Sequence, residues 1–141
     1  MNDVVINKIQ SIQRCVARAR EEYASDPDGF DENFTVQDAA ILNVLRAREQ
    51  AIDLANHVIR TRQLGIPNSS AETFETLHQN GAIDEDLAGR LKRMIGFRNR
   101  VIHQYQRMDI NILRAVITSG LEDLVDFADR IRAFPRQTPE A

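Results

Sequence analysis

The sequence predicts an all-α protein, an up-and-down bundle of four long helices with one short additional helix. Apolar residues recur every three or four positions through most of the chain, which is the spacing of one helix face. Short segments rich in Pro, Gly, Asp and Asn separate these periodic stretches and are typical of loops. No alternation of apolar and polar residues extends far enough to predict a strand.

The first two helices form the N-terminal half of the predicted bundle. An apolar stripe over residues 5–23 ends before the loop 25–29, which contains Pro and Gly. Thr35 is the predicted start of a second helix, which extends to about Leu64. We expect polar residues on its outer faces: Arg48, Glu49, Asp53, Asn56, His57 and Arg60. Asp53 and His57 are four residues apart, and we interpret them as an ordinary surface pair rather than a catalytic one.

Three capping residues predict where the remaining helices begin. Ser69, with Glu72 three positions later, forms a capping box for the short helix. Asp84 precedes the third long helix, whose first turn is acidic as the helix dipole favours. Asp109 precedes the last helix, and Pro135 ends it.

Length and composition indicate one soluble domain. The 141 residues predict a single domain over 1–134, followed by a flexible tail over 135–141. Cys15 is the only cysteine, so one chain cannot form a disulfide framework or a cysteine-rich metal site. There is neither an apolar run of about 20 residues nor a signal peptide, so we expect a cytoplasmic protein.

Residues 98–105, with the sequence RNRVIHQY, concentrate chemically active side chains on one predicted helix. From Leu87 to Met108 the chain has no Asp or Glu, although its overall net charge is −3. The same window contains six basic residues: Arg90, Lys92, Arg93, Arg98, Arg100 and Arg107. Clustered basic charge beside a histidine is typical of a site that binds phosphate.

Helix geometry limits how these residues act together. Five positions advance roughly 500° around a helix, so His103 lies roughly 140° from Arg98. Asn99 shares a face with His103, and Tyr105 shares one with Arg98. A site that uses both Arg98 and His103 therefore needs an irregular helix end or a second copy of the chain. We expect a second copy, combined with fraying after Ile102.

The motif resembles the signature of the HEPN superfamily, in which Arg-Asn is followed after three residues by His and then, two positions on, by Tyr. More narrowly, the whole chain resembles HEPN toxins encoded beside a minimal nucleotidyltransferase antitoxin. This resemblance implies an endoribonuclease that works as a homodimer without a metal or another cofactor, with the two motifs meeting near the two-fold axis. Gly96, inside the same helix, would permit close approach of a second copy.

The resemblance implies a role for each residue of the motif. His103 would transfer protons during attack of the ribose 2′-OH, and Arg98 would stabilise charge on the phosphate. Asn99 would orient His103 or hold a phosphate oxygen, and the product would be a 2′,3′-cyclic phosphate. Tyr105 would accept AMP from the antitoxin. Three further arginines would hold substrate phosphates: Arg93, Arg100 and Arg107.

Other interpretations remain open. Singly, each motif residue has an ordinary role in helix packing or on a solvated face. A rival function is a non-catalytic, nucleotide-binding subunit that positions substrate for a separate nucleotidyltransferase. Mutation of His103 separates these functions, because cleavage requires the imidazole and binding does not. The sequence leaves open whether messenger or transfer RNA is cut, the antitoxin stoichiometry, and whether neutralisation uses modification, complex formation or both.

Overall fold

The computed structural model describes residues 3–104 and 109–134, and for residues 98–104 it describes the backbone alone. Helices and their connecting loops account for these residues, with no strand among them. The elements in chain order are α1 (Asp3–Ser25), α2 (Phe34–Thr61), α3 (Ser70–Gln79), α4 (Glu85–Gln104), α5 (Ile110–Ala115), the π-helical segment η2 (Val116–Gly120) and α6 (Leu121–Ala133).

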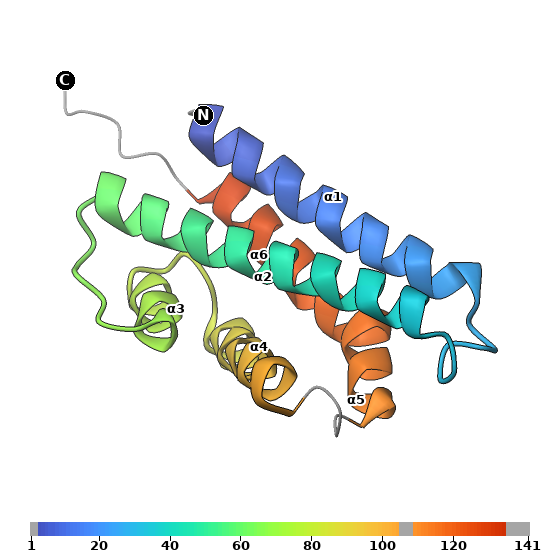
Figure 1. Cartoon of the computed structure of the whole chain (residues 1–141). Helices are drawn as coiled ribbons and strands as arrows, with labels where there is room; N and C mark the ends of the chain where they lie inside the picture. The colour runs from blue at the N-terminus through green and yellow to red at the C-terminus, as the bar shows by residue number, and fades with distance from the viewer. Residues whose placement is uncertain (1–2, 105–108, 135–141) are drawn as a thin grey trace.

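The long helices run alternately up and down a single bundle (Figure 1). α1 and α2 pack side by side along their length, and the rod formed by α5, η2 and α6 lies against them. α4 packs on α3 and α6 and also contacts α2. This arrangement confirms the predicted bundle of four long helices with one short additional helix.

The core consists of the apolar stripes that the helical spacing predicted. Phe74 of α3 and Phe127 of α6 meet edge to face, with ring centroids 5.4 Å apart. Each fully buried Val, Leu, Ile or Phe contributes about 1.5–3 kcal/mol through the hydrophobic effect. Such residues come from every long helix and from α3: Ile12, Val16, Leu54, Leu77, Leu91, Leu113, Leu124 and Phe127.

The caps predicted for the short helix, the third long helix and the last helix are all confirmed. Ser69 accepts a backbone N–H at 3.1 Å, Asp84 accepts one at 2.8 Å, and Asp109 accepts one at 2.9 Å. Each donor lies in the first turn of the helix that the capping residue precedes, where backbone N–H groups have no partner within the helix. The pKa of Asp84 is lowered, chiefly by this backbone hydrogen bond.

The predicted start of α2 at Thr35 is wrong. Asn33 is the cap, and its Oδ1 accepts the N–H of Val36 at 3.1 Å. The amide of Asn33 also donates to Asp26 at 3.1 Å, which fastens the cap to the preceding loop. Asn33 therefore caps the helix, because its side chain accepts a backbone N–H of the first turn and also bonds to Asp26. Thr35 lies within that first turn.

The end of α2 also differs from the prediction. The helix ends at Thr61, before the predicted end near Leu64. Gln63 has a φ of 55° and Gly65 a φ of 147°. Because an α helix requires negative φ throughout, the chain leaves the helix before Leu64.

The last helix contains a π-helical segment that we did not predict. The hydroxyl groups of Thr118 and Ser119 each donate to the carbonyl four residues earlier, at 2.8 Å. Such bonds compete with the backbone pattern and bend helices. At Gly120 an added Cβ would lie 3.4 Å from the terminal carbon of the Met94 side chain of α4, which is an ordinary packing distance.

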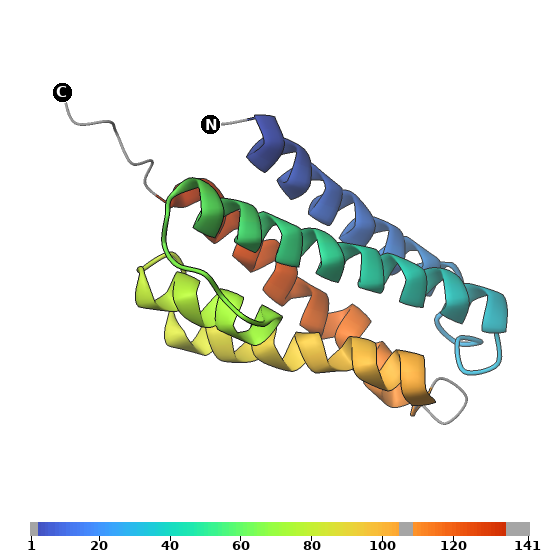
Figure 2. The same ribbon diagram turned by 60° about the vertical axis from the view of Figure 1, so that its left-hand side comes forward.

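The C-terminal end of α4 lies at the same end of the bundle as the α1–α2 loop and the beginnings of α2 and α5 (Figure 2). Arg114 of α5 forms an ion pair with Asp31 of that loop. α4 remains helical through Gln104, so the fraying expected after Ile102 is wrong. The motif therefore begins on a regular helix.

The acidic loop between α1 and α2 is held by its own hydrogen bonds. The carboxylate of Asp26 accepts the N–H of Gly29 at 3.0 Å in addition to the Asn33 amide. Across the described ranges, no three His, Cys, Asp or Glu residues are grouped to hold a metal ion. Within those same ranges, no helix is both long and apolar enough to span a bilayer.

Candidate active site

The motif occupies the last two turns of α4 and the residues that follow. For its residues on α4 the structure describes the backbone and not the side chains: Arg98, Asn99, Arg100 and His103. Tyr105 and Arg107 lie outside the described residues. The roles assigned to these six side chains therefore stay predictions, while the helix that carries four of them is described.

The regularity of α4 sets the register of the motif. Because the helix continues through Gln104, positions 98 and 103 are separated by roughly 140° around its axis. Positions 99 and 103 share a face, because they are four residues apart. Within one copy, the Arg98 and His103 positions therefore face different directions.

Two of the basic residues in this segment are bound in ion pairs. Arg90 lies 3.1 Å from Asp86 and also pairs with Asp123 of α6. Nζ of Lys92 lies 2.5 Å from a carboxylate oxygen of Glu75 on α3, and this bond lowers the pKa of Glu75. These pairs fasten α4 to its neighbours, so they do not add free positive charge for a substrate.

Arg93 is different. Its side chain is exposed and forms no ion pair with any residue that the structure describes. It borders a cavity of about 270 Å³ between α4 and η2, which Phe97 and Val116 also line. Among the predicted phosphate ligands, Arg93 is the one whose side chain is described, and its exposure fits that role.

Comparison with known proteins identifies the family. The family model for "Ribonuclease HepT-like" matches residues 12–131, from α1 to α6. The chain belongs to the ribonuclease HepT-like family. It is 45% identical over 133 residues to mRNA nuclease HepT of Shewanella oneidensis, covering 94% of this chain and 99% of the relative.

Solved structures agree with this assignment. A tri-AMPylated HEPN toxin from Shewanella oneidensis, in complex with an MNT antitoxin, is 44% identical with a TM-score of 0.88. A toxin–antitoxin structure with AMP-PNP is also 44% identical, with a TM-score of 0.87. Each match covers 94% of this chain and 99% of the solved one. The predicted membership of the HEPN superfamily is confirmed.

This HepT-like chain contains a buried arginine that the sequence pattern missed. We expected Arg48 on an outer face of α2, but it is 7% exposed and meets α4. Its guanidinium pairs with Glu49 and donates to the carbonyl oxygen of Ile95 at 3.3 Å. A signal for burial was present, because Arg48 lies four residues after Val44 and four before Ile52, both in the apolar stripe.

Gly96 follows Ile95 on α4 of the HepT-like bundle. A Cβ added at Gly96 would meet no atom within 4 Å in the described part of the chain. Packing against the described residues of one copy therefore does not explain the glycine.

Asp53 and His57 lie in the C-terminal half of α2, away from the motif on α4. A carboxylate oxygen of Asp53 is 3.7 Å from Nζ of Lys8 on α1. The pKa of His57 is lowered, first by burial and then by the charges of Arg60 and Lys8. A lowered pKa keeps the imidazole neutral at neutral pH. Asp53 is therefore paired with Lys8 of α1, and the interpretation of Asp53 and His57 as an ordinary surface pair stays a prediction.

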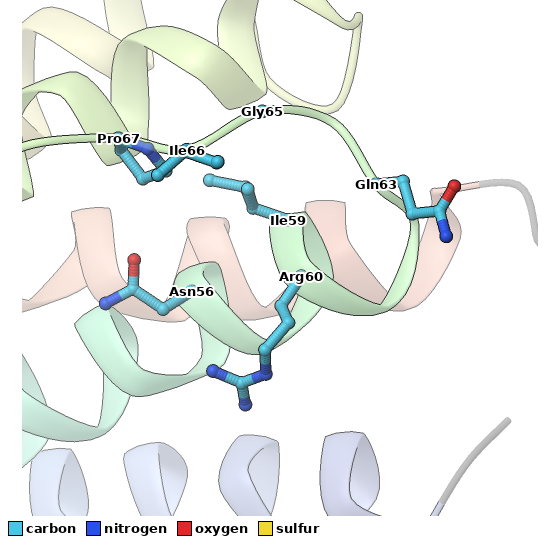
Figure 3. A pocket seen from close by; sticks show the side chains of 7 residues that line it. All are labelled: Asn56, Ile59, Arg60, Gln63, Gly65, Ile66 and Pro67. Carbon is cyan, nitrogen blue, oxygen red and sulfur yellow. The ribbon is translucent and has the colours of Figure 1, made fainter.

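A second cavity, of about 670 Å³, is also remote from the motif. It lies between the C-terminal end of α2 and the loop that leads to α3 (Figure 3). Ile59 of α2 and Ile66 of the loop face each other across it, and Asn56 and Arg60 line the helix side. Because this is the opposite end of the HepT-like bundle from the end of α4, we do not assign it to the active site.

Proposed function

We propose that this chain is the toxin of a toxin–antitoxin pair and acts as an endoribonuclease. The observation that carries the proposal is the 45% identity to mRNA nuclease HepT over 99% of that relative. The close structural match to a HEPN toxin bound to an MNT antitoxin supports the same assignment. Messenger RNA is therefore the first substrate to test, with transfer RNA as the comparison.

The mechanism that we propose cleaves RNA without a metal ion. The ribose 2′-oxygen attacks the adjacent phosphorus, the bond from phosphorus to the 5′-oxygen breaks, and a 2′,3′-cyclic phosphate remains. His103 transfers the protons that leave the 2′-OH and reach the 5′-oxygen, since imidazole titrates near neutral pH. The fixed positive charge of Arg98 stabilises the phosphate oxygens, and Asn99 orients His103 or binds one of these oxygens.

We propose that a homodimer completes this site. On a regular α4 the Arg98 and His103 positions diverge by roughly 140°, so one copy does not direct both at a single phosphate. A second α4 packed near a two-fold axis would bring Arg98 of one copy beside His103 of the other. No described atom lies within 4 Å of a Cβ added at Gly96, which supports close approach of that second helix.

Basic residues along α4 would extend the site over neighbouring phosphates. Arg93 and Arg100 are seven residues apart and share a helix face. Arg107 follows the end of α4 in the sequence. Arginine suits this role because its guanidinium forms paired hydrogen bonds with phosphate oxygens.

A chelator is expected to leave cleavage unchanged. Neither the proposed nucleophile nor the proton transfers require a metal ion. Because EDTA then removes no catalytic interaction, the initial rate of cleavage should change by less than about twofold. The measurement is the rate of cleavage of a labelled RNA with excess EDTA, with a magnesium-dependent nuclease as control. Loss of activity with EDTA and recovery with Mg²⁺ would refute the metal-free mechanism.

A further inference from the structure

A buried arginine on α2 holds the backbone of α4 just before the motif begins. Nη2 of Arg48 donates to the carbonyl oxygen of Ile95 at 3.3 Å. In an α helix this carbonyl also accepts the backbone N–H of the residue four positions later, Asn99. Arg48 therefore contacts the helical turn in which Arg98 and Asn99 stand.

We propose that Arg48 is a positioning residue for the RNA-cleaving site. Its guanidinium fixes the turn of α4 that carries Arg98 and Asn99, and so sets where these residues meet the substrate. This inference rests on the proposed function, in which both residues act on one phosphate. Catalytic groups must be held within about 0.5 Å of their working positions, and supporting hydrogen bonds provide that precision.

The burial of Arg48 argues for such a role. Burying a guanidinium is costly, and an apolar side chain of similar volume often gives equal or greater stability. An apolar side chain would not orient α4, whereas the guanidinium donates both to Glu49 and to the Ile95 carbonyl and so holds the α4 backbone in one position. Glu49 is about half exposed, so it can hold the guanidinium in place without itself being buried.

Arg90 provides a matched control. It also joins α4 to a neighbouring helix, through Asp123 of α6. Arg90 lies near the beginning of α4, however, and its partners are side chains rather than the α4 backbone beside the motif. Losing Arg90 should weaken packing without moving the turn of Arg98.

The experiment compares Arg48→Met, Arg48→Lys and Arg90→Met in the full-length protein, using a short labelled RNA. We expect Arg48→Met to lower kcat by about 10- to 100-fold, the loss caused by displacing a catalytic group by up to 1 Å, with KM changed much less. Arg48→Lys should recover part of this loss, because an ammonium group still donates to the Ile95 carbonyl. Arg90→Met should lower the melting temperature yet keep kcat within about twofold.

Amide hydrogen exchange supplies a readout that does not depend on cleavage. Exchange at the Asn99 amide should accelerate in Arg48→Met and stay unchanged in Arg90→Met, because Arg48 bonds to the α4 backbone at that turn and Arg90 pairs with side chains elsewhere. Unchanged exchange in Arg48→Met, or an equal fall in kcat in both methionine variants at equal folded fraction, would overturn the inference. If the wild-type protein does not cleave RNA, the proposed function fails, and the exchange rate at Asn99 alone tests whether Arg48 holds the turn of α4. If Arg48→Met does not fold, Arg48→Lys is judged by the same two measurements.

Discussion

Replacing His103 with alanine is expected to lower RNA cleavage by about 10²- to 10⁴-fold, the contribution typical of a general acid or base. The imidazole is the group in the motif that titrates near neutral pH, so its loss removes proton transfer in both directions. Arg98→Ala should lower cleavage by about 10²- to 10³-fold, because charge on the phosphate loses its fixed cation. Both changes should leave the helical fold intact.

The measurement is single-turnover cleavage of a labelled RNA, with circular dichroism to confirm folding. His78→Gln and Arg132→Ala are suitable controls, because His78 bonds only to the Ile83 carbonyl among described residues and Arg132 is exposed on α6. Normal cleavage by His103→Ala would exclude the proposed catalytic role. Intact RNA binding with no cleavage in the wild type would favour the rival, a non-catalytic nucleotide-binding subunit.

Incubation with the cognate antitoxin and ATP is expected to add AMP to Tyr105 and to suppress cleavage almost completely. The solved HEPN toxin that is 44% identical to this chain is tri-AMPylated. Each AMP would bring a negative phosphate and a bulky nucleoside beside the motif. That phosphate can pair with Arg98 or Arg100, occupy the position of the substrate phosphate and repel RNA.

Intact mass spectrometry would count the added AMP groups, and fragmentation would locate them. Tyr105→Phe should keep nuclease activity and resist modification. Tyr23 is a poorer acceptor, because its ring is partly buried and meets Phe30 edge to face at a centroid distance of 4.9 Å. AMP found on Tyr23 with Tyr105 unmodified, or inhibition with no nucleotide transfer, would contradict the proposed neutralisation and favour inhibition by complex formation.

Helical spacing predicted the fold well because the core of this protein is built almost entirely from apolar stripes. The caps at Ser69, Asp84 and Asp109 were equally predictable, since each acts on the turn directly after it. The start of α2 was not, because Asn33 is chosen over Thr35 by a hydrogen bond to Asp26, a residue of the loop before the helix. The π-helical segment was not predicted, because apolar residues recur at ordinary helical spacing through it, at Val116, Ile117 and Leu121.

The candidate site was predictable to a different degree. The motif stands out because Arg, Asn, His and Tyr at fixed spacing form a recognisable pattern. Charge counting overstated the free positive charge, since Arg90 and Lys92 are paired with acids on α6 and α3. The burial of Arg48 was not predicted, because an arginine within an apolar stripe is normally assigned to the surface. Only the folded bundle shows that the Ile95 carbonyl lies within its reach.

We propose above that two copies of the chain together form one RNA-cleaving site. Mixed dimers of Arg98→Ala and His103→Ala test it directly, because each heterodimer would contain one site with both residues intact and one with neither. Native mass spectrometry would establish how much heterodimer forms. We expect the mixture to regain activity, approaching half of the wild-type rate per heterodimer, although each parent alone is inactive. A mixture that contains heterodimers and stays as inactive as its parents would contradict the shared site.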